Sequence, residues 1–115
     1  MDFSLSDDQK AIKASIRKLC SDFGDEYWYS HDEDGTFPNE FFMAMAKAGW
    51  LGIAMPEEFG GSGLGVIEAT LLMQEVAYAG AMSAASAIHI NIFGPHAIVV
   101  HGSAEQKARW LPGLI

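Results

Sequence analysis

The carboxylate pair Glu68 and Glu75 comes closest to catalytic chemistry in this sequence. The two residues are seven positions apart, so a helix places both carboxylates on one face. Paired carboxylates can serve as general acid and general base, but they more often form a solvated or interhelical edge. The sequence also lacks the Gly-x-Ser-x-Gly turn of serine hydrolases. We therefore assign no catalytic residue to this chain.

Two groups of residues raise the question of a metal site. Of the four histidines, His96 and His101 are five positions apart, which puts them on different faces of a helix, and no His-Glu-x-x-His or cysteine-rich motif is present. The acidic cluster within residues 25–36 lacks the Asp-x-Asp-x-Asp-Gly pattern and distal Glu of a calcium loop. We predict no metal site and interpret the acidic cluster as solvated surface.

A glycine-rich segment, residues 60–65 (GGSGLG), resembles a phosphate-binding loop at the start of a helix. It does not match the Gly-x-Gly-x-x-Gly motif, no Lys-Ser/Thr pair follows it, and no predicted strand precedes it. A turn that leads into a helix is therefore the favoured interpretation.

The secondary-structure elements that position these side chains are predicted to be helices, because apolar residues recur with the helical period along most of the chain. No run of alternating apolar and polar residues is long enough to predict a strand. The first helix is predicted to begin at Ser6, where Ser6 and Gln9 form a capping box, and to end at Gly24 as a left-handed stop. Its apolar residues recur every three or four positions, with Cys20 beside them: Ile12, Ile16, Leu19 and Phe23. Residues 25–36 are predicted to form a loop packed by its aromatic side chains.

Further helices are expected along the rest of the chain. The patterns predict helices at about 38–48, 64–79 and 82–93, a short helix up to His101, and a final helix opened by a capping box of Ser103 and Gln106. The fold class is therefore all-α, an up-and-down helical bundle of about five to six helices that forms one domain over residues 1–115.

Composition and charge limit the classes of molecule that this protein can bind. Half of the 115 residues are hydrophobic, and the formal net charge of −8 disfavours nucleic acid and anionic membrane surfaces. The single cysteine excludes an internal disulfide, and the N-terminal residues do not resemble a secretory signal, so we expect a cytoplasmic protein. Residues 76–104 carry no acidic or basic side chain, but Gly80 and Gly94-Pro95 interrupt them, which favours two buried helices over a membrane span.

Several segments resemble the N-terminal domain of the acyl-CoA dehydrogenase family in order and spacing. The central segments are Phe37–Phe42 (FPNEFF), Ala46–Ile53 (AKAGWLGI) and Pro56–Gly65 (PEEFGGSGLG). The opening Phe3–Gln9 (FSLSDDQ) and the later Gly102–Pro112 (GSAEQKARWLP) are similar as well. Together they cover nearly the whole chain.

This resemblance implies a flavoenzyme. Family members use FAD to oxidise the Cα–Cβ bond of an acyl-CoA thioester, with a glutamate base that removes the α-proton, and an electron-transferring flavoprotein usually accepts the electrons. The helical domain is followed in the family by a β-domain and a second helical domain, which contain the glutamate and most flavin contacts. The apolar residues 110–115 at the end of the sequence suggest a cut between domains. We therefore expect the fragment alone to be inactive and to bind no FAD, and the full-length enzyme to form a homo-oligomer.

The resemblance also suggests a substrate pocket. In the family, the helix that matches residues 82–93 helps to line the acyl-chain pocket, and small side chains at 83–87 leave room for a ligand there. The predicted pocket residues are Ala85, Ser86, His89 and Ile92. A polar His89 suits a short, branched or functionalised acyl group, although a hydrogen-bonded core histidine explains it equally well.

Two other functions stay open at this point. One is a self-contained helical protein that binds a partner through its apolar face and has no enzymatic activity. The other keeps the flavin fold but transfers electrons to oxygen, as acyl-CoA oxidases do.

Overall fold

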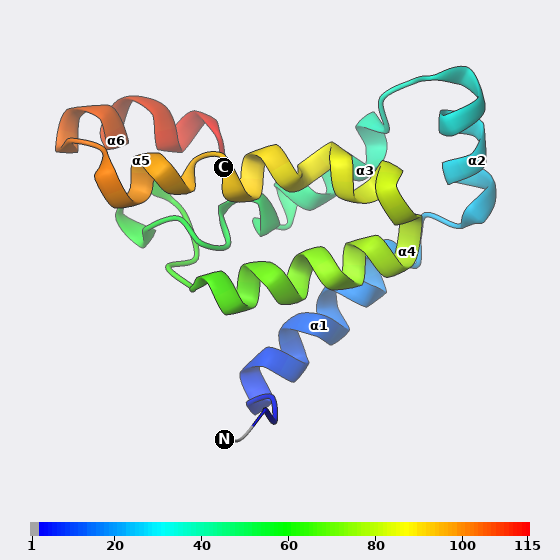
Figure 1. Cartoon of the computed structure of the whole chain (residues 1–115), viewed down its shortest axis with the longest axis horizontal. Coiled ribbons are helices and arrows are strands. Elements are labelled where there is room, and N and C mark those ends of the chain that lie inside the picture. Colours follow the sequence, from blue (N-terminus) through cyan, green and yellow to red (C-terminus); the bar gives the residue numbers. More distant parts are fainter. Residues whose placement is uncertain (1–2) are drawn as a thin grey trace.

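The computed structural model describes residues 3–115, which form helices joined by turns and loops, without a strand (Figure 1). The α-helices are α1 (Asp7–Cys20), α2 (Asp25–Asp34), α3 (Asn39–Lys47), α4 (Val66–Phe93), α5 (His96–His101) and α6 (Ala104–Trp110). Short 3₁₀ turns occur at Trp50–Gly52, Glu57–Phe59 and Leu111–Gly113. The all-α prediction is confirmed.

Helix α4 is a hairpin rather than a single rod. Gly80 and Ala81 leave the helical region, with φ/ψ of −137°/23° and 49°/−137°, so the chain turns back on itself (Figure 1). We call residues 66–79 the first limb and residues 82–93 the second limb. The two helices predicted at 64–79 and 82–93 correspond to these limbs, so the predicted break at Gly80 is confirmed.

Helix α1 lies along the first limb of α4 (Figure 1). The predicted capping box opens it: the Ser6 hydroxyl accepts from the Gln9 backbone N–H, and the Gln9 side chain accepts from the Ser6 N–H, both at 3.1 Å. Contacts to the limb advance together along both helices, from Gln9–Glu68 to Arg17–Glu75. The two helices are therefore parallel, whereas the limbs of α4 are antiparallel.

The loop predicted for residues 25–36 is wrong, because these residues form helix α2. Gly24 does not end α1 in a left-handed conformation: α1 ends at Cys20, and Gly24, with φ of −79°, is the N-cap of α2. Asp25 and Glu26 favour the positive end of the helix dipole, and Gly35 ends α2 with φ of 63°. The apolar pattern missed this helix because Trp28 is its only buried residue.

One core unites these helices. It contains Ile16 and Cys20 of α1, Trp28 of α2, Phe41 and Met45 of α3, and residues of both limbs of α4. Cys20, which lies beside the apolar residues of the first helix in the sequence, is 2% exposed and packs in this core. Helix α3 ends as predicted before Gly49, which has φ of 81°.

The stretch Val66–His101 is long and apolar enough to cross a membrane by length and composition. Its geometry favours core helices, because each limb of α4 has a length of only about 20 Å against the roughly 30 Å of a bilayer core. The limbs also contribute Leu72, Val76 and Ile88 to the core.

Candidate functional site

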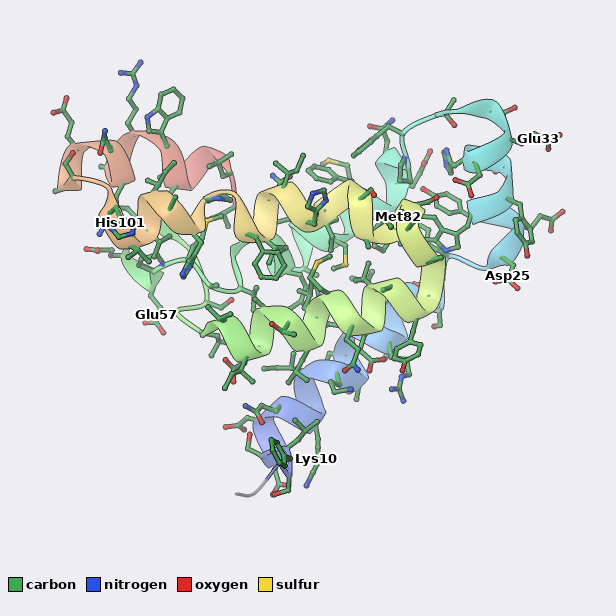
Figure 2. All side chains as sticks on the ribbon, in the orientation of Figure 1. Lys10, Asp25, Glu33, Glu57, Met82 and His101 are labelled. Carbon is green, nitrogen blue, oxygen red and sulfur yellow. The ribbon has the colours of Figure 1, made fainter. Side chains whose placement is uncertain are left out.

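The second limb of α4 has a core face and an outward face. Ala84, Ile88 and Ile92 recur every four residues and are buried against the rest of the domain. The outward face carries Met82, Ser86, His89, Ile90 and Phe93, which are all exposed. Figure 2 shows Met82 at the turn where this limb begins. Exposed apolar side chains on one helix face mark a surface for a ligand or partner.

The four predicted pocket residues divide between these faces. Ser86 and His89 are exposed and Ala85 is half-buried, so these three lie toward the outward face, whereas Ile92 is only 4% exposed and belongs to the core. The His89 Nδ1 atom lies 3.1 Å from the Ser86 carbonyl oxygen, and the residue is exposed. His89 is therefore not a core histidine.

The sequence prediction missed three residues of the outward face, Met82, Ile90 and Phe93. Residues 82, 86, 89 and 93 follow one another at intervals of four, three and four, which is the period of a single helix face. That spacing was visible in the sequence. It favours Phe93 over Ile92 as the apolar side chain next to His89 on the outward face.

Beside this limb lies a surface pocket of about 380 Å³, which we call the α2–α4 pocket. Ser83, Ser86 and Ala87 line one side, and α2 and the segment after it provide the other: His31, Asp32, Gly35, Thr36, Phe37 and Pro38. The Ser83 hydroxyl donates to Asp32 Oδ1 at 2.5 Å and ties the two helices together across it. Ser86 thus belongs to both the outward face and this pocket.

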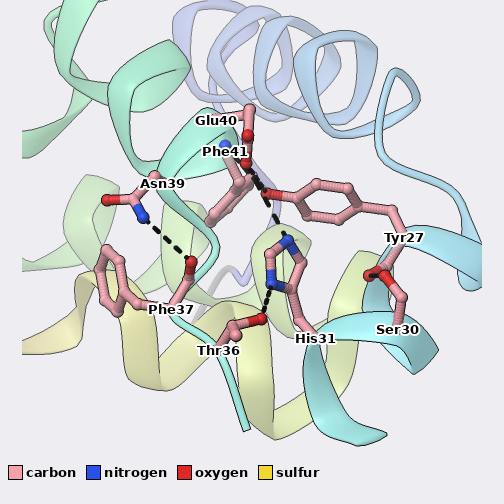
Figure 3. Close-up of polar contacts among 8 residues, drawn as sticks. All are labelled: Tyr27, Ser30, His31, Thr36, Phe37, Asn39, Glu40 and Phe41. Carbon is pink, nitrogen blue, oxygen red and sulfur yellow. Dashed lines mark hydrogen bonds and ion pairs between the residues drawn. The ribbon is translucent and has the colours of Figure 1, made fainter. Parts of the chain in front are cut away.

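Polar contacts hold the wall of the pocket in place (Figure 3). His31 Nδ1 lies 2.7 Å from the Thr36 hydroxyl, and its Nε2 lies 4.0 Å from a carboxylate oxygen of Glu40. The Tyr27 hydroxyl donates to Glu40 and accepts from the Phe41 backbone N–H. Burial is the main cause that raises the pKa of Tyr27. This network fixes the segment between α2 and α3 against α2.

The carboxylates singled out in the sequence, Glu68 and Glu75, lie between helices, as the interhelical interpretation predicted. Glu68 accepts from the Gln9 side chain at 2.8 Å. Glu75 is 3% exposed. Its carboxylate forms ion pairs with Arg17 Nε at 2.9 Å and with Lys13 Nζ at 3.0 Å. The Arg17 hydrogen bond is the largest cause that lowers the pKa of Glu75. Glu75 is thus held as a carboxylate that joins α1 to α4.

A second pocket, of about 350 Å³, contains Cys20 together with Arg17 and Glu75. Burial, reinforced by the charge of Glu75, raises the pKa of Cys20 to about 11. The thiol is therefore protonated at neutral pH, and a protonated thiol is a poor nucleophile. Packing explains this cysteine better than reactivity.

The backbone of the glycine-rich loop at residues 60–65 is hydrogen-bonded to residues 52–55 rather than left free to bind a ligand. The N–H groups of Ser62, Gly63 and Leu64 donate to carbonyl oxygens within residues 52–55, at 2.8–3.0 Å. A Cβ at Gly61 would lie 2.2 Å from the Met55 carbonyl oxygen, so only glycine permits this approach. The turn interpretation is confirmed. Among residues 3–115, no group of three metal-ligating side chains is assembled.

Comparison with known proteins agrees with this geometry. Residues 6–115 match the family described as acyl-CoA dehydrogenase, N-terminal domain. The chain is 37% identical over 114 residues to acryloyl-CoA reductase (NADH) of Anaerotignum propionicum, covering 99% of this chain and 29% of that protein. It is 38% identical over 107 residues to the probable acyl-CoA dehydrogenase YdiO of Escherichia coli, covering 92% and 27%.

A mammalian relative is similar over the same region. The mitochondrial isovaleryl-CoA dehydrogenase of Bos taurus is 32% identical over 114 residues, covering 96% of this chain and 26% of that protein. The chain spans less than a third of the length of these relatives. With a family match over nearly all of its residues and the helical fold described above, the chain belongs to the acyl-CoA dehydrogenase family, as its N-terminal domain.

Proposed function

We propose that this chain is the N-terminal part of an FAD-dependent acyl-CoA dehydrogenase that oxidises the Cα–Cβ bond of an acyl-CoA thioester. The family match over residues 6–115 and relatives named for acyl-CoA reactions support this proposal. One of those relatives is named as a reductase, whereas the others are named as dehydrogenases, which favours the oxidative direction. We assign the oxidative direction to this protein.

The role of this domain is to border the acyl chain with the second limb of α4. The observation that carries this role is the outward face, where Ala85, Ser86 and His89 lie beside the exposed apolar residues Met82 and Phe93. Ligand pockets are mostly apolar with a few polar groups that set orientation. Small residues let an acyl chain lie close to the helix, while Ser86 and His89 supply the polar groups.

We infer that the described residues do not hold the flavin by themselves. The diphosphate of a dinucleotide requires cations or free N–H groups at a helix N-terminus. Arg17, which lines one pocket, is paired with Glu75, and the side chain of Glu68 accepts from the Gly65 N–H at the start of α4. In this proposal, FAD is therefore held mainly by other parts of the parent enzyme, and no chemical step is assigned to residues of this chain.

The partners follow from the same proposal. They are an acyl-CoA substrate, an electron-transferring flavoprotein, the later domains of the parent and further copies of it in a homo-oligomer. The exposed apolar face of α4 supports the contacts between domains or copies. A cytoplasmic location stays a prediction, supported by the single cysteine.

Substitution of Ala85 tests the acyl-chain role. In the full-length enzyme, Ala85→Trp is expected to shorten the range of accepted acyl chains, because the indole ring occupies space on the outward face. The kcat/KM should fall steeply for long chains and remain close to the wild-type value for the shortest. Ala14→Trp, at an exposed position on α1, is the matched control.

A second measurement separates a pocket from tight packing. If Ala85 is small only because helices pack closely there, Ala85→Trp overpacks the core and costs about 1–3 kcal/mol of stability. A lower Tm with an unchanged chain-length profile would refute the pocket assignment.

The alternative is a helical interaction module without enzymatic activity. The exposure of Met82, Ile90 and Phe93 on one face also favours this function. Reduction of flavin in the purified full-length protein by any acyl-CoA supports the enzyme, whereas a colourless full-length protein that binds a partner through this face supports the module.

A further inference from the structure

The α2–α4 pocket is lined by both apolar and polar side chains. Phe37, Pro38 and Ala87 supply apolar surface, whereas Asp32, Ser83 and Ser86 supply a carboxylate and two hydroxyl groups. Ser86 connects this pocket to the outward face that, under the proposed function, borders the acyl chain. An acyl chain that lies along this face therefore reaches the pocket at Ser86.

The polar atoms of the pocket are arranged to accept hydrogen bonds. The Asp32 carboxylate has several acceptor positions, of which the Ser83 hydroxyl uses one. The Thr36 hydroxyl and His31 are already engaged with each other. The Ser86 hydroxyl is exposed and can accept or donate. A neutral group with a proton to donate fits this arrangement, while a negatively charged group is repelled by Asp32.

We propose that the α2–α4 pocket receives a hydroxyl group on the acyl chain of the substrate, donated to Asp32 beside Ser83 and Ser86. This inference rests on the proposed function and specifies its substrate class: acyl-CoA thioesters with a hydroxyl group distant from the thioester. A terminal methyl group leaves the Asp32 carboxylate without this partner. A terminal carboxylate places two like charges together.

The test uses the full-length enzyme and matched acyl-CoA thioesters that differ only in the end of the chain: methyl, hydroxyl or carboxylate, over a range of chain lengths. We expect the terminal hydroxyl to raise kcat/KM about tenfold over methyl at one length, since a hydrogen bond to a charged group typically has this effect. The carboxylate series should be the poorest.

Substitution of Asp32 tests the pocket directly. Asp32→Ala should remove the preference for hydroxyl and weaken discrimination against the carboxylate, each measured as a ratio to the methyl series of the same variant, because the loss of the Ser83 hydrogen bond acts on all three series alike. The control is Glu33→Ala, whose side chain is exposed and extends from α2 away from α4 (Figure 2). Asp32→Asn adds a check: it keeps one acceptor oxygen but removes the charge, so it should relieve the exclusion of the carboxylate more than it weakens the hydroxyl preference.

The results separate this inference from the proposed function. Activity on alkyl acyl-CoA with no preference for hydroxyl at any length, or a preference that Asp32→Ala leaves intact, overturns the inference alone. The absence of activity on every acyl-CoA overturns the proposed function and this inference together.

Discussion

The turn of α4 leaves no room for a side chain at Gly80. A Cβ at this position would lie 2.4 Å from Cε2 of Trp28 and 2.6 Å from Cβ of Ala84. The φ of Gly80 is negative, at −137°, so alanine meets steric crowding rather than left-handed backbone strain. We predict that Gly80→Ala destabilises the domain because the indole ring has to move.

The size of the effect follows from what Trp28 contacts. The ring is 5% exposed, packs edge-on against Phe41 at 4.9 Å between ring centroids, and donates its N–H to the Phe23 carbonyl oxygen at 3.0 Å. Overpacking costs about 1–3 kcal/mol. Loss of the indole hydrogen bond adds about 1 kcal/mol. The free energy of unfolding should therefore fall by about 2–4 kcal/mol, and the Tm by about 8–16 °C.

Urea unfolding monitored by circular dichroism measures this difference. Gly113→Ala is the matched control, because a Cβ there meets no atom within 4 Å. In a Trp28→Leu background, Gly80→Ala should cost at least 1 kcal/mol less, since the clashing ring is gone. A Gly80→Ala protein within about 0.5 kcal/mol of wild type would refute the reasoning. An equal cost in both backgrounds would show that Trp28 is not the cause.

Three further predictions concern the same helices. Ala81 has a φ of 49°, so Ala81→Gly should stabilise the domain by about 1 kcal/mol after the entropy cost of glycine, measured as a higher urea midpoint. The pKa of Glu75 is lowered from 4.5, mainly by the hydrogen bond from Arg17. The ionised carboxylate therefore stabilises the folded domain above pH 4.5, and this stabilisation is lost as the pH falls through the folded pKa. Glu75→Gln should make the free energy of unfolding less dependent on pH in the acid range, and an unchanged dependence would contradict this role. The isolated chain should self-associate through the outward face of α4, and Ile90→Lys should shift it toward monomer in sedimentation; a wild-type chain that is monomeric at high concentration would argue against this surface.

Local chemistry explains which elements could be predicted from the sequence. The capping boxes at Ser6–Gln9 and Ser103–Gln106 both form, because their hydrogen bonds involve only residues three positions apart. The break at Gly80 was also predictable. Helix α2 was not, because its stability comes from Trp28 inserting beside Gly80, a contact between residues far apart in the sequence. Its local signals, two acidic residues after Gly24 and a glycine at 35, were present without an apolar stripe.

The candidate site shows the same division. Small residues in the second limb of α4 indicated a surface for close approach, and Ala85, Ser86 and His89 do lie toward the outward face. Ile92 was assigned to that face, but its side chain lies in the core, since which side of a helix packs inward depends on its tertiary partners. The α2–α4 pocket could not be predicted, because it requires α2 to exist and to meet Ser83 across 51 positions.

The parallel pairing of α1 with the first limb of α4 also has a consequence for the order of folding. Gln9 and Glu68 are 59 positions apart, and Arg17 and Glu75 are 58 apart, so this pairing closes a long loop. The two limbs of α4 are joined by a turn of two residues, Gly80 and Ala81, so bringing the limbs together closes only a very short loop. Because short loops close with less loss of chain entropy, we expect the α4 hairpin to form early and α1 to dock late. Amide protons of α1 should then exchange with solvent through partial openings that leave the α4 hairpin protected.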